Sequence, residues 1–346
     1  MVNELMYDLN LISKYRTPLM GIAALMIILC HAPQYGVAMP NSISSVMLRG
    51  GLGVDIFLYL SGVGCWYSLS KGVTLKKWYC KRFIRIFIPY FFMQFPFWAL
   101  KIFNGSFSIM NELMVFSTIN FWLYHVGAWY VALLIPLYIV TPFIYKILEL
   151  GNRVFIALLM VVVIITVCML NIDMFVGIIH EILHNLQWAF GRVPSFIIGM
   201  AMAPLIKKGV KFNIFALIII PLLLYVAIHL LIDKNTPTEW CLVLPVLSVF
   251  IVFIPRIYKL NTIYNFFSWM GLVSLESYLA NIYLCGAVKD VLRQSQNANI
   301  LFTGGYLEYS IVIVLGLLLS YIVNKMSRII IKRIEIPSNL IINKNV

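Results

Sequence analysis

Long apolar runs dominate the chain, and short polar or charged segments separate each run from the next. A helix needs about 20 apolar residues to cross a hydrocarbon layer of roughly 30 Å, because each residue adds about 1.5 Å. The runs end at charges or at Pro, Gly and Asn breaks, and they predict ten membrane-spanning helices. The expected ranges are 17–36, 48–70, 84–103, 122–145, 154–171, 186–205, 213–232, 240–255, 263–286 and 306–324. The pattern therefore predicts an all-α fold, a polytopic transmembrane helical bundle.

Composition and the placement of charge agree with this fold. Of the 346 residues, 62% are hydrophobic and only 11% are charged, which lies outside the usual range of soluble domains. With the N-terminus in the cytoplasm, the inner segments hold 20 of the 26 Lys and Arg residues and the outer segments hold five. The positive-inside rule therefore places both termini in the cytoplasm. The same distribution explains the net charge of +13 without a nucleic-acid partner. We expect residues 1–346 to form one domain with no fused extracytoplasmic domain.

Few ionisable side chains lie within the predicted spans, and helix depth places them in one layer. Counted from the outer span ends, they lie roughly 8–15 Å below the outer surface. Taken singly, each has a structural explanation, such as an ion pair, a helix-end hydrogen bond or the interfacial aromatic belt. Together they favour a buried polar cavity that opens outward. The residues of this layer are His31, Asp55, Arg192 and Glu276, with Trp129 and Tyr130 at a similar depth.

A second polar feature is the basic segment KGVTLKKWYCKRFIRIFIPY, residues 71–90. The positive-inside signal and attraction to anionic membrane lipid explain its lysines. Arg82 and Arg85 differ, because they are three residues apart and share one helix face. Guanidinium groups suit polyphosphate, so this pair predicts a docking site for an anionic cosubstrate on the cytoplasmic side.

One short motif points to metal chemistry. The sequence HEILH, with His180 and His184, matches the HExxH pattern of zinc proteases. It flanks a predicted span and has no obvious third ligand nearby, and the six cysteines are scattered singly rather than in CxxC pairs. We therefore expect no metal site and no disulfide framework.

Several segments resemble the motifs of the membrane acyltransferase family 3, which comprises bacterial integral-membrane O-acyltransferases. The resemblance begins with MGIAALMIILCH, which looks like the first-span signature ending in histidine, and with GGLGVDIFLYLSGVGCWYSL, which is similar to the second span. It continues with YCKRFIRIFIPY, similar to an Arg-x-x-Arg-x-x-x-Pro entry to the third span, and with WYVALLIPLYIVTPFIY, GRVPSFIIGM and GLVSLESYL. The resemblance covers nearly the whole chain. It implies an enzyme of the bacterial cytoplasmic membrane that moves an acyl group from acyl-CoA to a carbohydrate hydroxyl.

Two positions depart from the pattern of this family. Many members carry an Arg where this chain has Met20, and a His where this chain has Asn281. Arg16 lies about one helical turn before Met20. The resemblance therefore makes Arg16 a candidate for the acyl-donor role of the missing Arg.

His31 is the expected catalytic base, because an imidazole titrates near neutral pH and accepts the proton of an attacking hydroxyl. Asp55 is expected to orient the ring and to favour its charged form. Direct transfer and an acyl-enzyme on His31 both fit these residues. The candidates for oxyanion stabilisation or acceptor binding are Tyr130, Arg192, Glu276 and Trp129. The candidates for binding the phosphates of acetyl-CoA, or of another acyl-CoA, are Arg82, Arg85 and Arg16.

Two other functions fit part of the pattern. A proton-coupled transporter or flippase of a saccharide or small acid also uses intramembrane ionisable residues, although no inverted repeat is evident. A structural subunit of a glycan assembly complex leaves the polar layer unexplained. An acyl transfer that takes acyl-CoA from inside and a carbohydrate or lipid-linked saccharide from outside explains both polar features, so it is the expected function.

Overall fold

The computed structural model describes residues 6–231, 237–294 and 305–335, and helices dominate the described backbone. The first half comprises β1 (Met6–Asp8), α1 (Asn10–Lys14), α2 (Arg16–Gln34), α3 (Asn41–Leu48), the 3-10 turn η2 (Arg49–Gly51), α4 (Leu52–Leu69), α5 (Leu75–Phe103), α6 (Ile109–Phe116), α7 (Ile119–Tyr124) and α8 (Trp129–Leu148). The second half comprises α9 (Arg153–Cys168), α10 (Ile178–Phe190), α11 (Val193–Lys208), β2 (Lys211–Asn213), α12 (Ile214–Leu231), α13 (Glu239–Tyr258), α14 (Asn261–Leu272), α15 (Ser274–Gln294) and α16 (Tyr306–Glu335).

Eight helical segments of the described chain are long and apolar enough to cross a membrane. This agrees with the expected helical membrane bundle, while the number of crossings and the side of the termini stay predictions. The segments are Arg16–Gln34, Asn41–Leu69, Leu75–Phe103, Trp129–Leu148, Ile178–Lys208, Ile214–Leu231, Glu239–Tyr258 and Tyr306–Ile334.

Four expected spans differ from the observed helices. The range 186–205 crosses the junction at Gly191 and Arg192, where α10 ends and α11 begins. The range 122–145 begins too early, because His125 (φ 55°) and Gly127 (φ 104°) interrupt the helix between α7 and α8 with left-handed backbone. The range 154–171 corresponds to α9, a shorter apolar helix that ends at Cys168. The range 263–286 is divided at Val273 into α14 and α15.

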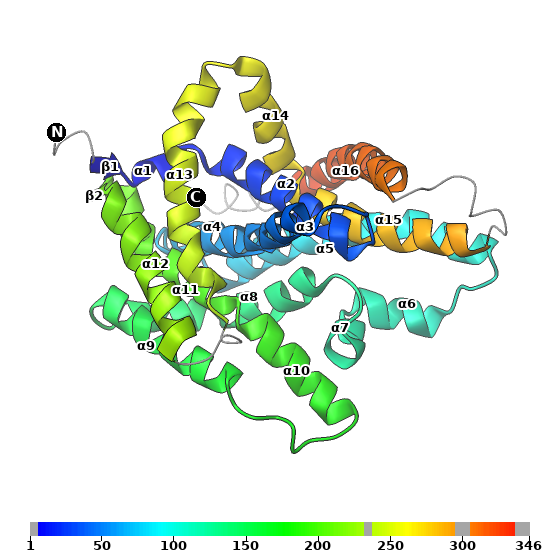
Figure 1. Ribbon diagram of the computed structural model, residues 1–346, viewed down its shortest axis with the longest axis horizontal. Coiled ribbons are helices and arrows are strands. Elements are labelled where there is room, and N and C mark those ends of the chain that lie inside the picture. Colours follow the sequence, from blue (N-terminus) through cyan, green and yellow to red (C-terminus); the bar gives the residue numbers. More distant parts are fainter. Residues whose placement is uncertain (1–5, 232–236, 295–304, 336–346) are drawn as a thin grey trace, which may run out of the picture.

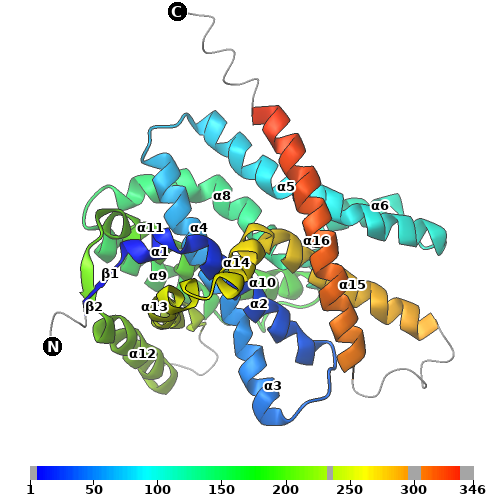
Figure 2. The same cartoon turned by 90° about the horizontal axis from the view of Figure 1, so that it is seen from above.

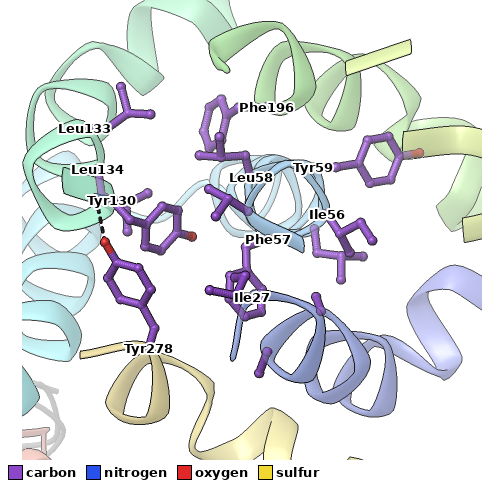
Figure 3. Packing of buried hydrophobic residues seen from close by; sticks show 14 of the residues in the cluster. Ile27, Ile56, Phe57, Leu58, Tyr59, Tyr130, Leu133, Leu134, Phe196 and Tyr278 are labelled. Carbon is purple, nitrogen blue, oxygen red and sulfur yellow. Dashed lines mark hydrogen bonds between the residues drawn. The ribbon is translucent and has the colours of Figure 1, made fainter. Parts of the chain in front are cut away.

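Helix α4 forms the centre of the bundle, with α2, α8, α11 and α15 around it (Figures 1 and 3). Most of its residues are buried, which explains why its sequence has no polar stripe. In Figure 3, Phe57 points towards Ile27 of α2, and Phe196 of α11 packs on the opposite side of α4. Helices α4 and α11 approach closely, because a Cβ on Gly62 would lie 2.2 Å from the Phe196 carbonyl oxygen. Glycine is therefore required at this crossing.

The N-terminal end of α2 and the C-terminal part of α16 meet at one end of the bundle. Arg16 of α2 and Arg328 of α16 line the same pocket there, together with Arg85 of α5. Figure 2 shows α16 crossing α5 on this side of the molecule. We call this the basic end.

Strands β1 and β2 pair antiparallel, with Met6 opposite Asn213 and Asp8 opposite Lys211.

Candidate functional site

Three arginines from two helices meet in one cavity, which we call the arginine pocket. It contains about 660 Å³ of space free of protein atoms, part of it open to solvent, which is in the range of small-molecule sites. No Asp or Glu is among its lining residues, all of which belong to the described chain. The polar side chains that line it are Arg16, Arg82, Arg85, Tyr130, Tyr138, Tyr278, Ser61 and Ser274.

The central helix holds two of these guanidinium groups through its backbone. Arg82 Nη2 donates to the carbonyl oxygen of Gly64 at 2.8 Å, and Arg16 Nη2 donates to that of Leu60 at 3.5 Å. The Arg82 guanidinium also lies 5.7 Å from the ring centre of Tyr138, which favours its positive charge. Arg16 Nε is buried and has no hydrogen-bond partner among the described residues. Half-buried guanidinium groups that donate to neutral carbonyl groups form a site that an anion would complete.

Glu276 lies at the basic end rather than beside His31. It belongs to the first turn of α15, accepts a hydrogen bond from Asn324 Nδ2 at 2.8 Å, and lines a second pocket with Arg16, Arg85 and Arg328. The expectation that it shares the layer of the other ionisable groups is therefore wrong. The cause is the position of the helix end: the expected span ended at residue 286, whereas α15 continues to Gln294, so Glu276 lies farther from that end than expected.

At the C-terminal end of α2, His31 is half-buried, and its imidazole forms a hydrogen bond with the side chain of Asn281. Asn281 is one of the two positions at which this chain departs from the family pattern. His31 Nδ1 lies 2.5 Å from Asn281 Oδ1. Asn281 Nδ2 donates to Tyr309 Oη at 3.2 Å, and Tyr309 Oη donates to the carbonyl oxygen of Ile28. In this series of hydrogen bonds, the Asn281 amide nitrogen is a donor, so its oxygen is the atom that accepts a hydrogen bond from His31 Nδ1–H. The lone pair of Nε2 is then available to accept a proton.

Asp55 is fully buried and pairs with other residues than His31. Its Oδ2 accepts from Arg192 Nη1 at 2.5 Å, and its Oδ1 accepts from Ser195 Oγ at 2.8 Å. Arg192 Nη2 also lies 3.6 Å from Glu239 Oε1. The expected hydrogen bond from His31 to Asp55 is therefore absent from the described structure. Asp55 instead joins α4 to the start of α11, and Asn281 takes the place next to the imidazole.

The two aromatic candidates of α8 face different surroundings. Trp129 packs edge-to-face against Trp188, with ring centres 4.4 Å apart. Tyr130 lines the arginine pocket, and its backbone N–H donates to Tyr278 Oη at 3.1 Å (Figure 3). Trp129 therefore belongs to an aromatic cluster and Tyr130 to the pocket.

Helix α15 connects the arginine pocket to the imidazole. Tyr278 lines the pocket, and Asn281 follows three residues later on the same helix face. This separation corresponds to about 4.5 Å along the helix axis. One turn of α15 therefore carries both a residue of the pocket lining and the hydrogen-bond partner of His31.

The HEILH motif lies on α10, and the rings of His180 and His184 are 6.3 Å apart. Within the described residues, no group of three or more His, Cys, Asp or Glu side chains is arranged to hold a metal ion. All six cysteines are free thiols.

The apolar helices, the central α4 and the buried ionisable groups define a multi-pass helical membrane protein with polar sites inside its bundle. A family model described as an acyltransferase domain, acyltransferase 3, matches residues 19–325. The chain belongs to this family and is a membrane acyltransferase. No curated protein and no solved structure matches it.

Proposed function

We propose that this membrane acyltransferase moves an acetyl group from acetyl-CoA to a hydroxyl of a cell-surface or precursor carbohydrate, in the bacterial cytoplasmic membrane. The observation that carries the proposal is the arginine pocket, in which Arg16 and Arg82 donate to backbone carbonyls of α4. Its lining residue Tyr278 lies one helical turn from Asn281, the hydrogen-bond partner of His31. The CoA phosphates bind Arg16, Arg82 and Arg85, since guanidinium groups form charge-assisted hydrogen bonds with phosphate. The pantetheine arm then extends along the Tyr278 side of the pocket and brings the thioester to His31.

His31 acts as the base in this reaction. The hydroxyl oxygen forms the new ester bond to the acyl carbon while the carbon–sulfur bond to CoA breaks. The hydroxyl proton passes to His31 Nε2 and then to the leaving thiolate. Asn281 holds the ring in the tautomer that leaves Nε2 unprotonated beforehand. Tyr130 lines the same pocket and supplies a hydroxyl donor for the developing oxyanion.

The test follows acetyl-labelled acetyl-CoA in membranes that contain the wild type, His31→Ala or Arg82→Gln. We expect the wild type to release CoA and to label the glycan fraction, and His31→Ala to lose at least 100-fold in rate. Arg82→Gln is expected to raise the KM for acetyl-CoA roughly 10- to 100-fold, since hydrogen bonds to charged groups contribute about 1.5–3 kcal/mol.

Lys77→Gln is the matched control, because Lys77 is an exposed cation on the same helix. It should keep the wild-type KM. A wild type that releases no CoA in the presence of host glycan would contradict the proposal. It would direct attention to the alternative function, proton-coupled transport.

A further inference from the structure

A large polar cavity lies between α9, α10, α12 and α13, separate from the arginine pocket. It contains about 1570 Å³ of space, part of it open to solvent. We call it the polar pocket. The lining residues that matter below are Arg49, His184, Trp188, Arg192, Tyr225 and Glu239.

The polar pocket combines aromatic rings with hydrogen-bonding groups. Trp188 is held by edge contacts to Trp129 and His125, with ring centres 4.4 and 4.9 Å away. Tyr225 of α12 lies against His229, with ring centres 4.4 Å apart. Rigid aromatic faces next to donors and acceptors are what a sugar ring needs, because its C–H face is apolar and its hydroxyls both donate and accept.

The charges in the pocket favour an uncharged ligand. Arg192 is already compensated by Asp55 at 2.5 Å and by Glu239 at 3.6 Å. An anionic ligand would meet the carboxylate of Glu239, and a cationic one would meet Arg192 and the exposed Arg49. Hydroxyl groups avoid both like-charge repulsions, because they can donate to Glu239 and accept from the two arginines.

The rim of the polar pocket lies near His31 but does not contact it. Arg49 of η2 lines the pocket, and Cys30 Sγ donates to the carbonyl oxygen of the preceding Leu48 at 3.2 Å. His31 follows Cys30 directly, so the rim at Arg49 lies on the order of 10 Å from His31. Turn η2 separates the two, because Gly50 packs tightly on the backbone of α2 at Met26. A ligand seated in the pocket must therefore extend past η2 to reach the base.

We propose that the polar pocket binds an uncharged sugar residue of an oligosaccharide acceptor, next to the residue whose hydroxyl is acylated at His31. This inference rests on the proposed acyl transfer. It specifies the acceptor as a chain of at least two sugars, one held at Trp188 and one presented to His31.

The experiment uses the full-length protein in membranes, labelled acetyl-CoA, and saccharides released from the host surface glycan by mild acid. The saccharides are separated by size into a monosaccharide pool and an oligosaccharide pool. We expect Trp188→Ala to raise the KM for the oligosaccharide pool about tenfold. The KM for acetyl-CoA and the rate with the monosaccharide pool should stay at wild-type values. Trp188→Phe, which keeps an aromatic face, should lie between Trp188→Ala and the wild type.

Two further variants keep the test decisive if Trp188→Ala folds poorly. Arg49→Gln changes an exposed side chain of the rim and should raise the same KM. Trp98→Ala is the matched control, because Trp98 packs on Phe95 of α5 and lines neither pocket. If the wild type acylates oligosaccharides and Trp188→Ala, Trp188→Phe and Arg49→Gln match it, this inference is wrong and the proposed function stands. If the wild type acylates neither pool, both are wrong.

Discussion

The hydrogen bond between His31 and Asn281 leads to a sharp kinetic prediction. Replacing Asn281 with Ala removes the acceptor that holds His31 Nδ1–H and leaves the ring free to choose either tautomer. Within the described residues, the His31 ring also lies edge-to-face against Tyr35, with ring centres 6.1 Å apart, and this contact does not distinguish the two ring nitrogens. We expect kcat to fall while the KM for acetyl-CoA stays the same, because Asn281 does not line the arginine pocket.

The size of the loss follows from how the bond changes during the reaction. A hydrogen bond between neutral groups contributes about 0.5–1.5 kcal/mol net, and one to a charged group about 1.5–3 kcal/mol. His31 becomes positively charged as it accepts the hydroxyl proton, so the bond gains about 1–2 kcal/mol in the transition state. Losing that gain lowers kcat roughly 5- to 30-fold.

The assay compares initial rates of CoA release and acetyl-CoA titrations for Asn281→Ala and Tyr309→Phe. Tyr309→Phe removes the hydroxyl that accepts from Asn281 Nδ2 at 3.2 Å, so the amide is no longer fixed and a smaller loss in kcat is expected. Tyr321→Phe, an exposed tyrosine on the same helix, serves as the control. An Asn281→Ala enzyme with kcat within twofold of the wild type would refute the role of Asn281 in setting the tautomer.

Two further predictions concern stability. Asp55→Asn should lower the thermal midpoint in detergent, by up to about 3 kcal/mol in unfolding free energy, because Arg192 loses its nearer, fully buried charged partner and keeps only Glu239 at 3.6 Å. The double variant Asp55→Leu/Arg192→Met should recover much of the loss, and equal midpoints for Asp55→Asn and the wild type would contradict this account. Arg153 donates two hydrogen bonds to Glu149 and lowers the pKa of that carboxyl, so its stabilisation is present above the unfolded pKa near 4.3 and is lost as pH falls through the folded value. Glu149→Gln should therefore cost about 0.3–0.5 kcal/mol at pH 7, and this cost should shrink as pH falls below the unfolded pKa, measured as thermal midpoints.

The sequence predicted which residue types lie in the site better than it predicted which side chains pair with one another. Apolar runs indicated the helices, because length and hydropathy alone decide whether a helix fits a membrane. The spacing of Arg82 and Arg85 indicated a cationic helix face, and both line the arginine pocket. These features are local, so they are read from one segment at a time.

The pairing of buried groups depends on how helices rotate against one another, and a sequence pattern does not contain that rotation. Asp55 and His31 were placed at similar depths, but Asp55 faces α11 and pairs with Arg192. The imidazole faces α15 and meets Asn281. One signal was available: Asn281 is one of the two positions at which this chain departs from the pattern of the family that it resembles.

The positions of Arg16 and Met20 fit the arrangement of cations along α4. Both residues line the arginine pocket and lie one turn apart on α2. Arginine at position 16 rather than 20 begins about 6 Å closer to the basic end, where Arg16 contacts the carbonyl of Leu60 and Arg82 that of Gly64. Those carbonyls are one turn apart on α4, so the two guanidinium groups are held at successive levels of one helix. The diphosphate of the proposed acetyl-CoA donor carries its charges on two adjacent groups, so it would relieve the repulsion between both arginines at once.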